Sequence, residues 1–321
     1  MSDKAHLLIP FAACAAPQAR EALAGLQLPH LEKLLRRLSP GAPDAGDEHS
    51  FSPPHERVLA RLHGLPAADG QIPWAAFERQ ARGLETGSHA WAVITPCHWQ
   101  VGTTSASMSD PAALGISEGE SQALLEAMRP YFNEDGIELL YHAPGRWHAR
   151  SELFRGLPTA SLERVIGRGI DDWMPKTPEA RPLRRLQNEM QMLLYTHPLN
   201  DGRAARGLAP VNSFWAHGTG ALPETPSLAQ APGGSAGPLI AAGLQGAALR
   251  EDWPAWADAW RAIDANECAR LDEHLGRTGQ ATLTLCGERS AQTFEAMPVS
   301  ILTRLSGLFQ RPSPARAMEA L

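Results

Sequence analysis

Short runs of apolar residues, of the length of buried strands, recur along the chain. They lie at residues 6–13, 90–95 and 281–285, and each is long enough for one strand of a sheet. Residues 137–142 and 146–150 flank an Ala-Pro-Gly turn, which is typical of a β-hairpin. These runs therefore predict the strands of a sheet.

Helical spacing of apolar residues fills much of the chain between these runs. Helices are predicted over residues 26–38, 52–63, 117–131, 159–167, 182–196, 253–275 and 297–309. The third of them begins at a capping box made by Ser117 and Glu120, and the fifth has the clearest apolar stripe. A short strand at 211–216 is predicted to run into a glycine-rich turn, and a Pro/Gly/Ser-rich loop is expected over 222–238. Strands that alternate with helices predict an α/β fold.

The length of 321 residues suits one large α/β domain or a core with an insertion. Between residues 90 and 156 the predicted order is strand, helix, strand, strand, which is compatible with a compact insertion. We therefore expect residues 1–89 and 157–321 to form the two parts of an α/β core. Residues 90–156 are expected to form a β-α-β-β insertion or subdomain.

Charge and composition exclude several classes of protein. The 29 basic and 35 acidic residues give a net charge of −6, which argues against nucleic acid as the main partner. The first apolar run is too weak for a signal peptide, and no uncharged stretch is long enough to cross a membrane. The four cysteines are widely spaced without a C-x-x-C pair, as is usual for reduced thiols in the cytosol. A cytoplasmic protein that does not contact a membrane is therefore expected.

The first group of candidate residues lies within residues 46–56. His55 and Glu56 are candidates for ligand binding at the start of a helix. Asp47, His49 and His55 offer the alternative of a metal site, since Asp and His side chains bind divalent metals. No H-x-x-x-H or H-E-x-x-H spacing places two imidazoles on one helical face, so the competing interpretation is a solvated acidic loop. No resident metal or cofactor is predicted.

A second group follows the apolar run at 90–95 and comprises His98, Trp99 and Gln100. α/β proteins place ligand-binding loops after such strands. Cys97 beside His98 invites interpretation as a nucleophile with its base, but neighbouring residues on an extended chain point to opposite faces. We therefore expect a wall of a binding site, with a purely structural strand edge as the alternative.

The third group is Asn212, Trp215, His217, Gly218 and Gly220, where a strand is predicted to pass into a glycine-rich turn. Glycine allows the backbone to approach a ligand closely. A lone G-x-G without a following helix does not support a dinucleotide site. These residues are therefore candidates for binding a ligand, and a small anion is the class expected.

The fourth group lies on the polar face of the predicted helix 182–196. Arg185, Asn188 and Glu189 follow one another at helical spacing. Guanidinium and amide groups on one face can bind an amide, a carboxylate or the backbone of a partner. The competing interpretation is a solvated helix face, so these residues are candidates for a protein-interaction surface.

Five segments carry a resemblance to a known family. The sequence resembles the RpfE-type regulatory protein family of proteobacteria, whose name implies a link to the regulation of pathogenicity factors. The matching segments are SPPHER (52–57), TPCHWQVG (95–102), LPTASLERVIGR (157–168), RPLRRLQNEMQMLLYTHPLND (181–201) and PVNSFWAHGTG (210–220). The resemblance implies a regulatory role without defining a molecular activity.

Residues 212–223, NSFWAHGTGALP, are similar to the N-x-x-W-x-W-G-x-G-x-x-P stretch of archaeal-type cofactor-independent phosphoglycerate mutases. This resemblance implies the alkaline-phosphatase fold, with a mixed or parallel sheet flanked by helices, an inserted segment and two metal ions. The metal ligands of those enzymes are absent here. Pro10 follows the first strand in place of an Asp, no two His are four apart, and residues 287–290 stand where an Asp-His pair would follow the last strand. Two-metal phosphoryl transfer depends on such ligands, so little or no mutase activity is expected.

The leading hypothesis is a non-catalytic, cytosolic regulatory or ligand-sensing protein on a degenerate phosphatase-like scaffold. Its partner would be a small anionic ligand or a protein. The first alternative is a phosphomutase or phosphohydrolase with a non-standard site that includes Asp47, His49, His55 and His98. The second alternative is an interaction module that docks a partner through the Arg185 face.

Overall fold

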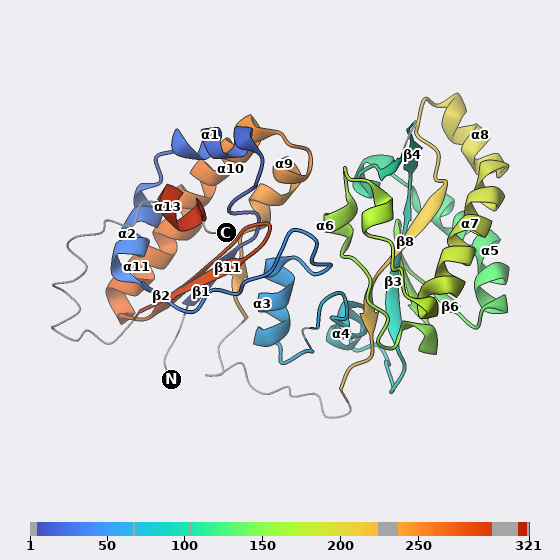
Figure 1. Cartoon of the computed structure of the whole chain (residues 1–321), viewed down its shortest axis with the longest axis horizontal. Coiled ribbons are helices and arrows are strands. Elements are labelled where there is room, and N and C mark those ends of the chain that lie inside the picture. Colours follow the sequence, from blue (N-terminus) through green and yellow to red (C-terminus); the bar gives the residue numbers. More distant parts are fainter. Residues whose placement is uncertain (1–4, 67, 103–104, 224–236, 297–313, 320) are drawn as a thin grey trace. The chain divides into compact units, whose positions relative to one another are not determined.

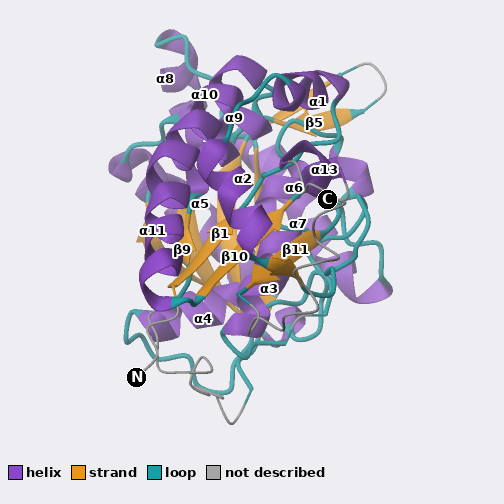
Figure 2. Ribbon diagram, turned by 90° about the vertical axis from the view of Figure 1, so that its left-hand side faces the viewer, coloured by secondary structure: helices purple, strands orange, loops and turns teal. Residues whose placement is uncertain are grey.

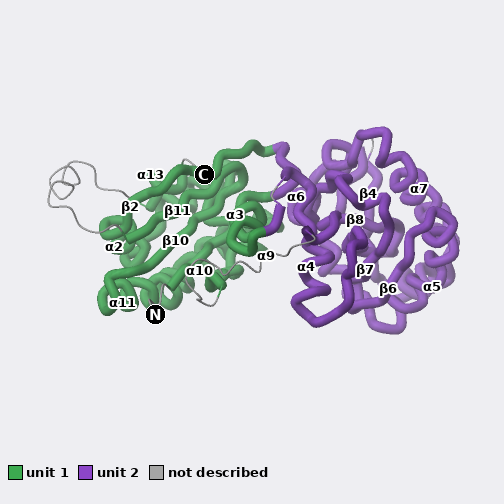
Figure 3. Tube along the Cα trace, turned by 90° about the horizontal axis from the view of Figure 1, so that it is seen from below, with its two compact units in different colours: residues 1–48, 53–64, 228–321 green, residues 49–52, 65–227 purple. Residues whose placement is uncertain are grey.

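The computed structural model describes residues 5–66, 68–102, 105–223, 237–296, 314–319 and 321. The chain divides into two compact units, each with its own sheet and hydrophobic core (Figure 3). Unit 1 consists of residues 1–48, 53–64 and 228–321, and unit 2 consists of residues 49–52 and 65–227. The segment 90–156 therefore lies wholly within unit 2. None of the described helices is long and apolar enough to span a membrane.

Unit 1 contains a mixed sheet with the strand order β2-β11-β10-β1-β9, of which Figure 1 labels β1, β2 and β11. The strands are β1 (Ala5–Ile9), β2 (Ser39–Pro40), β9 (Leu239–Ile240), β10 (Ala281–Cys286) and β11 (Ala291–Glu295). Strand β1 runs parallel to β10 and to β9, and Leu7 lies opposite Leu283. Strand β11 is antiparallel to β10 and to β2. The carboxyl ends of β1 and β10 consequently meet at one edge of the sheet.

Helices cover both faces of this sheet, as Figure 2 shows around strands β1, β10 and β11. Because side chains alternate along a strand, Leu7 and Ile9 pack on one face and Leu8 on the other. Helix α3 (Pro54–Leu62) packs against Leu8. The opposite face is covered by α1 (Pro17–Ala24), α2 (Pro29–Arg37), α9 (Gln245–Leu249), α10 (Trp253–Ile263), α11 (Ala269–Thr278) and α13 (Pro314–Glu319).

Unit 2 contains an antiparallel sheet with the strand order β6-β7-β3-β8. The strands are β3 (Trp91–Cys97), β6 (Glu138–Ala143), β7 (Arg146–Arg150) and β8 (Ser213–Gly220). A separate two-stranded sheet pairs β4 (Trp99–Val101) with β5 (Ala106–Met108).

The two faces of the unit 2 sheet have different covers. Helices α5 (Glu118–Glu134) and α7 (Arg181–Tyr195) pack on the face that carries Ile94 and Phe214. Helix α4 (Trp74–Ala81) packs on the other face, against Trp91 and Val93. Unit 2 also contains the short helices α6 (Leu162–Val165) and α8 (Pro198–Ala205).

The predicted α/β class, with a mixed sheet flanked by helices, is confirmed. The hairpin is confirmed by the pairing of β6 with β7, and the capping box of Ser117 and Glu120 opens α5 as predicted. The helix predicted over 182–196 is confirmed as α7. The predicted helix 297–309 and most of the predicted loop 222–238 lie outside the described residues.

Several predicted boundaries were wrong. The first strand ends at Ile9 because Pro10 follows and Phe11 takes a φ of 55°, which no strand can accommodate. The helix predicted over 26–38 begins only at Pro29. The helix predicted over 159–167 is a single turn, α6. The helix predicted over 253–275 is present: it continues from α10 through a π-helical segment, Asp264–Cys268, into α11 and ends at Thr278.

Candidate functional site

The loops that follow β1 and β10 meet at the carboxyl ends of these parallel strands. Phe11 turns the chain away from β1, and its carbonyl accepts a hydrogen bond from the buried Trp256 indole at 3.0 Å. The next backbone N–H, that of Ala12, donates to the carbonyl of Cys286 at 2.8 Å, which holds the two loops together. After β10, the N–H of Gly287 donates to the Ser290 carbonyl at 2.9 Å and closes a tight turn.

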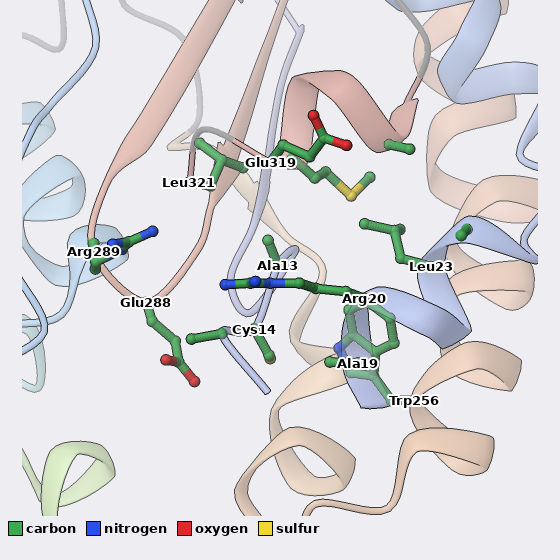
Figure 4. A pocket seen from close by; sticks show the side chains of 14 residues that line it. Ala13, Cys14, Ala19, Arg20, Leu23, Trp256, Glu288, Arg289, Glu319 and Leu321 are labelled. Carbon is green, nitrogen blue, oxygen red and sulfur yellow. The ribbon is translucent and has the colours of Figure 1, made fainter. Parts of the chain in front are cut away.

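These loops border a cavity of about 360 Å³ within unit 1. Its charged side chains are Arg20 on α1, Glu288 and Arg289 after β10, and Glu319 on α13 (Figure 4). Figure 4 shows the side chains of Arg20 and Arg289 extending toward each other across the cavity. The apolar part of the lining includes Leu23, Trp256 and Met318, and the Cys14 thiol also borders the cavity.

The C-terminal segment, residues 314–319 and 321, supplies one wall of this cavity. The main-chain oxygen of Leu321 accepts hydrogen bonds from the backbone N–H groups of Arg289 at 3.1 Å and Ser290 at 3.0 Å. The Ser290 hydroxyl donates to the same oxygen at 3.2 Å. Met318 and Leu321 are buried in the core of unit 1. The segment is therefore anchored on the loop that presents Arg289.

No group of three or more His, Cys, Asp or Glu side chains is arranged to hold a metal ion within the described parts of the chain. At the carboxyl ends of β1 and β10, the positions next to the cavity hold Ala13, Cys14, Glu288 and Arg289. A guanidinium group is a cation with donors only and cannot coordinate a metal ion. The arrangement suits an anion better than a divalent cation.

In unit 2, the structure brings together three of the residues singled out from the sequence. Asn212 accepts a hydrogen bond from the Trp99 N–H at 2.8 Å and donates one to the Trp99 carbonyl at 2.9 Å. The rings of Trp99 and Trp215 meet edge to face with centroids 6.5 Å apart. The Trp215 indole donates to the carbonyl of Ala160 at 2.9 Å. All these contacts are with groups of the chain itself, and both indoles are buried.

The neighbouring candidates His98 and Gln100 are more accessible. His98 is half-buried, and burial lowers the pKa of its imidazole below the usual value, opposed by a hydrogen bond with the backbone of Pro210. Gln100 is exposed on the short strand β4. Burial raises the pKa of the adjacent Cys97 thiol, which is fully buried, so this cysteine is a poor nucleophile.

His217, Gly218 and Gly220 lie inside strand β8, so the turn predicted after residue 216 was wrong. The two glycines adopt φ values of 62° and 139°, and a Cβ on either would lie 3.1 Å from a side chain at the start of α4. Glycine is required here because α4 packs closely on β8. The His217 ring lies 3.1 Å from the Thr95 hydroxyl, and burial is the main cause that lowers its pKa to about 3, with a smaller contribution from Arg146.

The candidates from residues 46–56 fall in both units. His55 is buried at the start of α3 in unit 1, where its ring lies 5.6 Å from the Phe11 ring, and Glu56 next to it is half-buried. Asp47 is exposed and belongs to unit 1, whereas the exposed His49 belongs to unit 2.

The candidate interaction face lies on α7. Arg185 is exposed and pairs with Asp135, and a longer contact of 3.5 Å joins it to Glu189. Asn188 is exposed on the same face. The structure extends this face with Met192 and Tyr195, whose exposed fractions are 77% and 86%.

Sequence reasoning missed the cavity of unit 1. Arg20 and Arg289 come from segments far apart in the chain, and neither belongs to a recognisable motif. The one signal in the sequence was the departure from the mutase pattern, since the Asp after the first strand and the Asp-His pair after the last strand are absent.

No protein-family model matches the chain. Over 124 residues, 37% of this chain, it is 29% identical to a probable 2,3-bisphosphoglycerate-independent phosphoglycerate mutase of Geobacter sulfurreducens, of which the match covers 30%. A 62-residue segment, 19% of the chain, is 34% identical to the 2,3-bisphosphoglycerate-independent phosphoglycerate mutase of Methanothrix thermoacetophila and covers 16% of it.

The chain is distantly similar to these mutases. It matches less than a third of the length of either relative. Among solved structures, it aligns with the cofactor-independent phosphoglycerate mutase of Thermoplasma acidophilum (TM-score 0.36, 13% identity, 92% of this chain and 90% of that one). It also aligns with the PH0037 protein of Pyrococcus horikoshii (TM-score 0.45, 13% identity, 92% and 88%). Since both TM-scores are below 0.5, the fold assignment rests on the strand order of this chain. The resemblance to the RpfE-type family stays a prediction.

Proposed function

We propose that the chain is a non-catalytic regulatory or ligand-sensing protein of the cytosol, built on a scaffold similar to that of phosphoglycerate mutases. One observation carries this proposal. At the carboxyl ends of β1 and β10, the cavity of unit 1 is bordered by Arg20 and Arg289, and the described residues contain no group of three or more side chains arranged to hold a metal ion.

The chemistry of phosphoryl transfer explains why this observation matters. Two-metal enzymes hold their ions with carboxylates and imidazoles, and the ions neutralise the charge that develops on the phosphoryl group. Arginines can bind the same phosphoryl or carboxylate group in its ground state, but they cannot activate a metal-bound nucleophile. The site therefore retains the capacity to bind an anion without the capacity to transfer it.

The location and size of the cavity support ligand binding. Open α/β sheets bind their ligands outside the carboxyl ends of the strands. A volume of about 360 Å³ lies at the small end of the range for ligand pockets. The residues His98, Trp99, Gln100, Asn212 and Trp215 of unit 2 remain a second proposed binding wall, of which His98 and Gln100 are accessible.

A phosphoester-processing enzyme with a non-standard site is the second candidate, and the sequence similarity to phosphoglycerate mutases favours it. The decisive experiment assays the purified chain for mutase and phosphoesterase turnover with added Mn²⁺, beside an authentic metal-dependent mutase. The metal content is measured by elemental analysis. We expect neither turnover nor stoichiometric metal. Metal-dependent turnover that is lost in His55→Ala would establish the second candidate instead.

A protein-interaction role is the third candidate, favoured by the exposed Met192 and Tyr195 beside Arg185 on α7. It requires that Met192→Asp abolishes capture of a partner while the circular-dichroism melt stays unchanged. Retained capture in that variant would remove this surface from consideration.

A further inference from the structure

We propose that the unit 1 cavity binds a small organic anion between Arg20 and Arg289, and that the C-terminal segment forms a detachable wall of this site. The inference rests on the ligand-binding function proposed above. It names the class of ligand and the part of the chain that responds to it.

Two guanidinium groups provide the charge for an anion. Arg20 projects from α1 and Arg289 from the turn after β10, and both reach into the cavity. Within the described residues, neither guanidinium forms an ion pair with a carboxylate of the chain. The planar fork of a guanidinium matches two oxygens of a carboxylate or phosphate, so a bound anion would be held from two sides.

The apolar lining requires the anion to carry a hydrocarbon part. Leu23, Trp256 and Met318 present apolar atoms to the cavity, and an inorganic ion would leave this surface unfilled. Burial of apolar surface contributes roughly 25 cal/mol for each Å² covered. The ligand class that satisfies both parts of the lining is a small carboxylic acid or phosphate monoester.

The charge balance of the cavity limits how much charge the ligand carries. Glu288 and Glu319 also border the cavity, so the four charged side chains sum to zero. A field without net positive charge disfavours a polyanion, whereas a single oxyanion group can still sit between the two arginines. Glu319 belongs to the C-terminal segment, so its negative charge moves with that segment.

The C-terminal segment is fixed by contacts that the ligand would reinforce. Its anchor is the main-chain oxygen of Leu321, which accepts hydrogen bonds from the N–H groups of Arg289 and Ser290. An anion on the Arg289 side chain steadies the same turn, so ligand binding and docking of the segment are linked. We therefore expect the ligand to slow the opening of this segment.

Gly287 offers a way to release the segment without changing the residues that line the cavity. A Cβ at this position would lie 2.6 Å from the Leu321 Cβ, 2.7 Å from its carbonyl carbon and 2.8 Å from its oxygen. Such distances are shorter than van der Waals contact allows, so Gly287→Ala forces Leu321 away from its anchor.

The test measures binding of glycerate, 3-phosphoglycerate, benzoate and inorganic phosphate to the full chain by calorimetry, with glycerol as the neutral control. We expect glycerate or benzoate, each with a single oxyanion group, to bind more tightly than inorganic phosphate or 3-phosphoglycerate. Arg20→Gln and Arg289→Gln should each weaken that binding by about tenfold or more. Arg277→Gln, an exposed arginine at the end of α11, should leave binding unchanged. Binding that survives Arg20→Gln with Arg289→Gln would overturn the assignment.

Hydrogen exchange tests the role of the segment. The amides of Arg289 and Ser290 should exchange faster in Gly287→Ala than in the parent chain, and the bound anion should slow them in the parent. Unchanged exchange on ligand addition would overturn the linkage.

If Gly287→Ala does not fold, the arginine variants still decide the anion site. If none of the probes binds at about 10 mM, the anion site falls while the non-catalytic function stands; turnover in the mutase assay would refute that function instead.

Discussion

The side chain of Asn212 occupies both backbone hydrogen-bonding groups of Trp99, accepting from its N–H at 2.8 Å and donating to its carbonyl at 2.9 Å. One side chain thereby acts as a strand partner for the start of β4. Asn212 itself is held by its N–H, which donates to the carbonyl of Cys97 at 3.1 Å. The resemblance between residues 212–223 and the mutases thus falls on a residue that organises the backbone of unit 2.

Replacing Asn212 by Ala removes both bonds and leaves two backbone groups of Trp99 without their partner. We expect a loss of about 2–3 kcal/mol in the free energy of unfolding, since each net bond contributes about 1 kcal/mol and an unpaired buried group adds to the cost. Urea unfolding followed by tryptophan fluorescence measures it. The control Asn188→Ala, on the exposed face of α7, should change stability by less than about 0.5 kcal/mol. Equal losses in the free energy of unfolding for the two variants would show that the Asn212 hydrogen bonds do not stabilise the fold.

Arg203 and Arg206 offer a comparison of buried and exposed charge around one carboxylate. Arg203 is fully buried and donates to the carbonyls of Ala209 and Leu114 and to Glu120, whereas Arg206 pairs with the same Glu120 from the surface. Arg203→Met should cost about 3–5 kcal/mol because it leaves buried acceptors unpaired. Arg206→Met should cost about 1 kcal/mol or less. Chemical denaturation of both variants checks the prediction, which fails if Arg206→Met proves the more damaging.

The same carboxylate gives unit 2 a defined response to acid. Burial raises the pKa of Glu120, but hydrogen bonds from Ser117 and Arg206, with the charge of Arg203, outweigh burial and lower the pKa to about 2. The ordinary value in an unfolded chain is about 4.3. The stabilisation is therefore complete above the unfolded pKa and is lost as pH falls through the folded one.

Glu120→Gln should accordingly flatten the decline of stability between about pH 5 and pH 2. Denaturant midpoints recorded across this range measure the slope. Glu134→Gln, at the exposed end of α5, serves as the control and should keep the slope of the parent chain. An identical slope in Glu120→Gln would contradict the assignment.

His217 makes a second contribution of the same sign. Its folded pKa of about 3 lies below the ordinary value of a histidine, mainly because burial disfavours the charged ring. Protonation therefore favours the unfolded chain, and stability declines as pH falls below about 6.5. Nuclear magnetic resonance should show the His217 ring neutral at pH 5, and His217→Gln should reduce the decline between pH 6.5 and 4. The exposed His89→Gln should not reduce it.

Local signals in the sequence predicted local structure well. The Ser117–Glu120 box, the Pro144-Gly145 turn and the apolar stripe of residues 182–196 each act within a few residues, and α5, the β6–β7 hairpin and α7 followed. The π-helical segment that begins at Asp264 could not be predicted in this way. Asp264 accepts hydrogen bonds from the N–H groups of His30 at 3.3 Å and Leu31 at 2.7 Å, and so caps a helix that is distant in sequence.

The candidate sites show the same division. The sequence analysis selected Trp99, Asn212 and Trp215 as candidate binding residues. The structure places these three residues in contact with one another. Spacing gave no sign of the Arg20–Arg289 pair, because these residues meet only after β1 pairs with β10. The absence of the mutase metal ligands after the first and last strands indicated where the cavity lies. It did not indicate which residues line the cavity.

The pairing of β1 with strands from the other end of the chain has a consequence for synthesis on the ribosome. Leu7 in β1 pairs with Leu239 in β9 on one side and with Leu283 in β10 on the other. Both partners are synthesised after every strand of unit 2. The sheet of unit 2 is complete once Gly220 has left the exit tunnel. Until then, the apolar strand β1, which precedes every strand of unit 2 in the sequence, has both edges open, and chaperones bind segments of this kind.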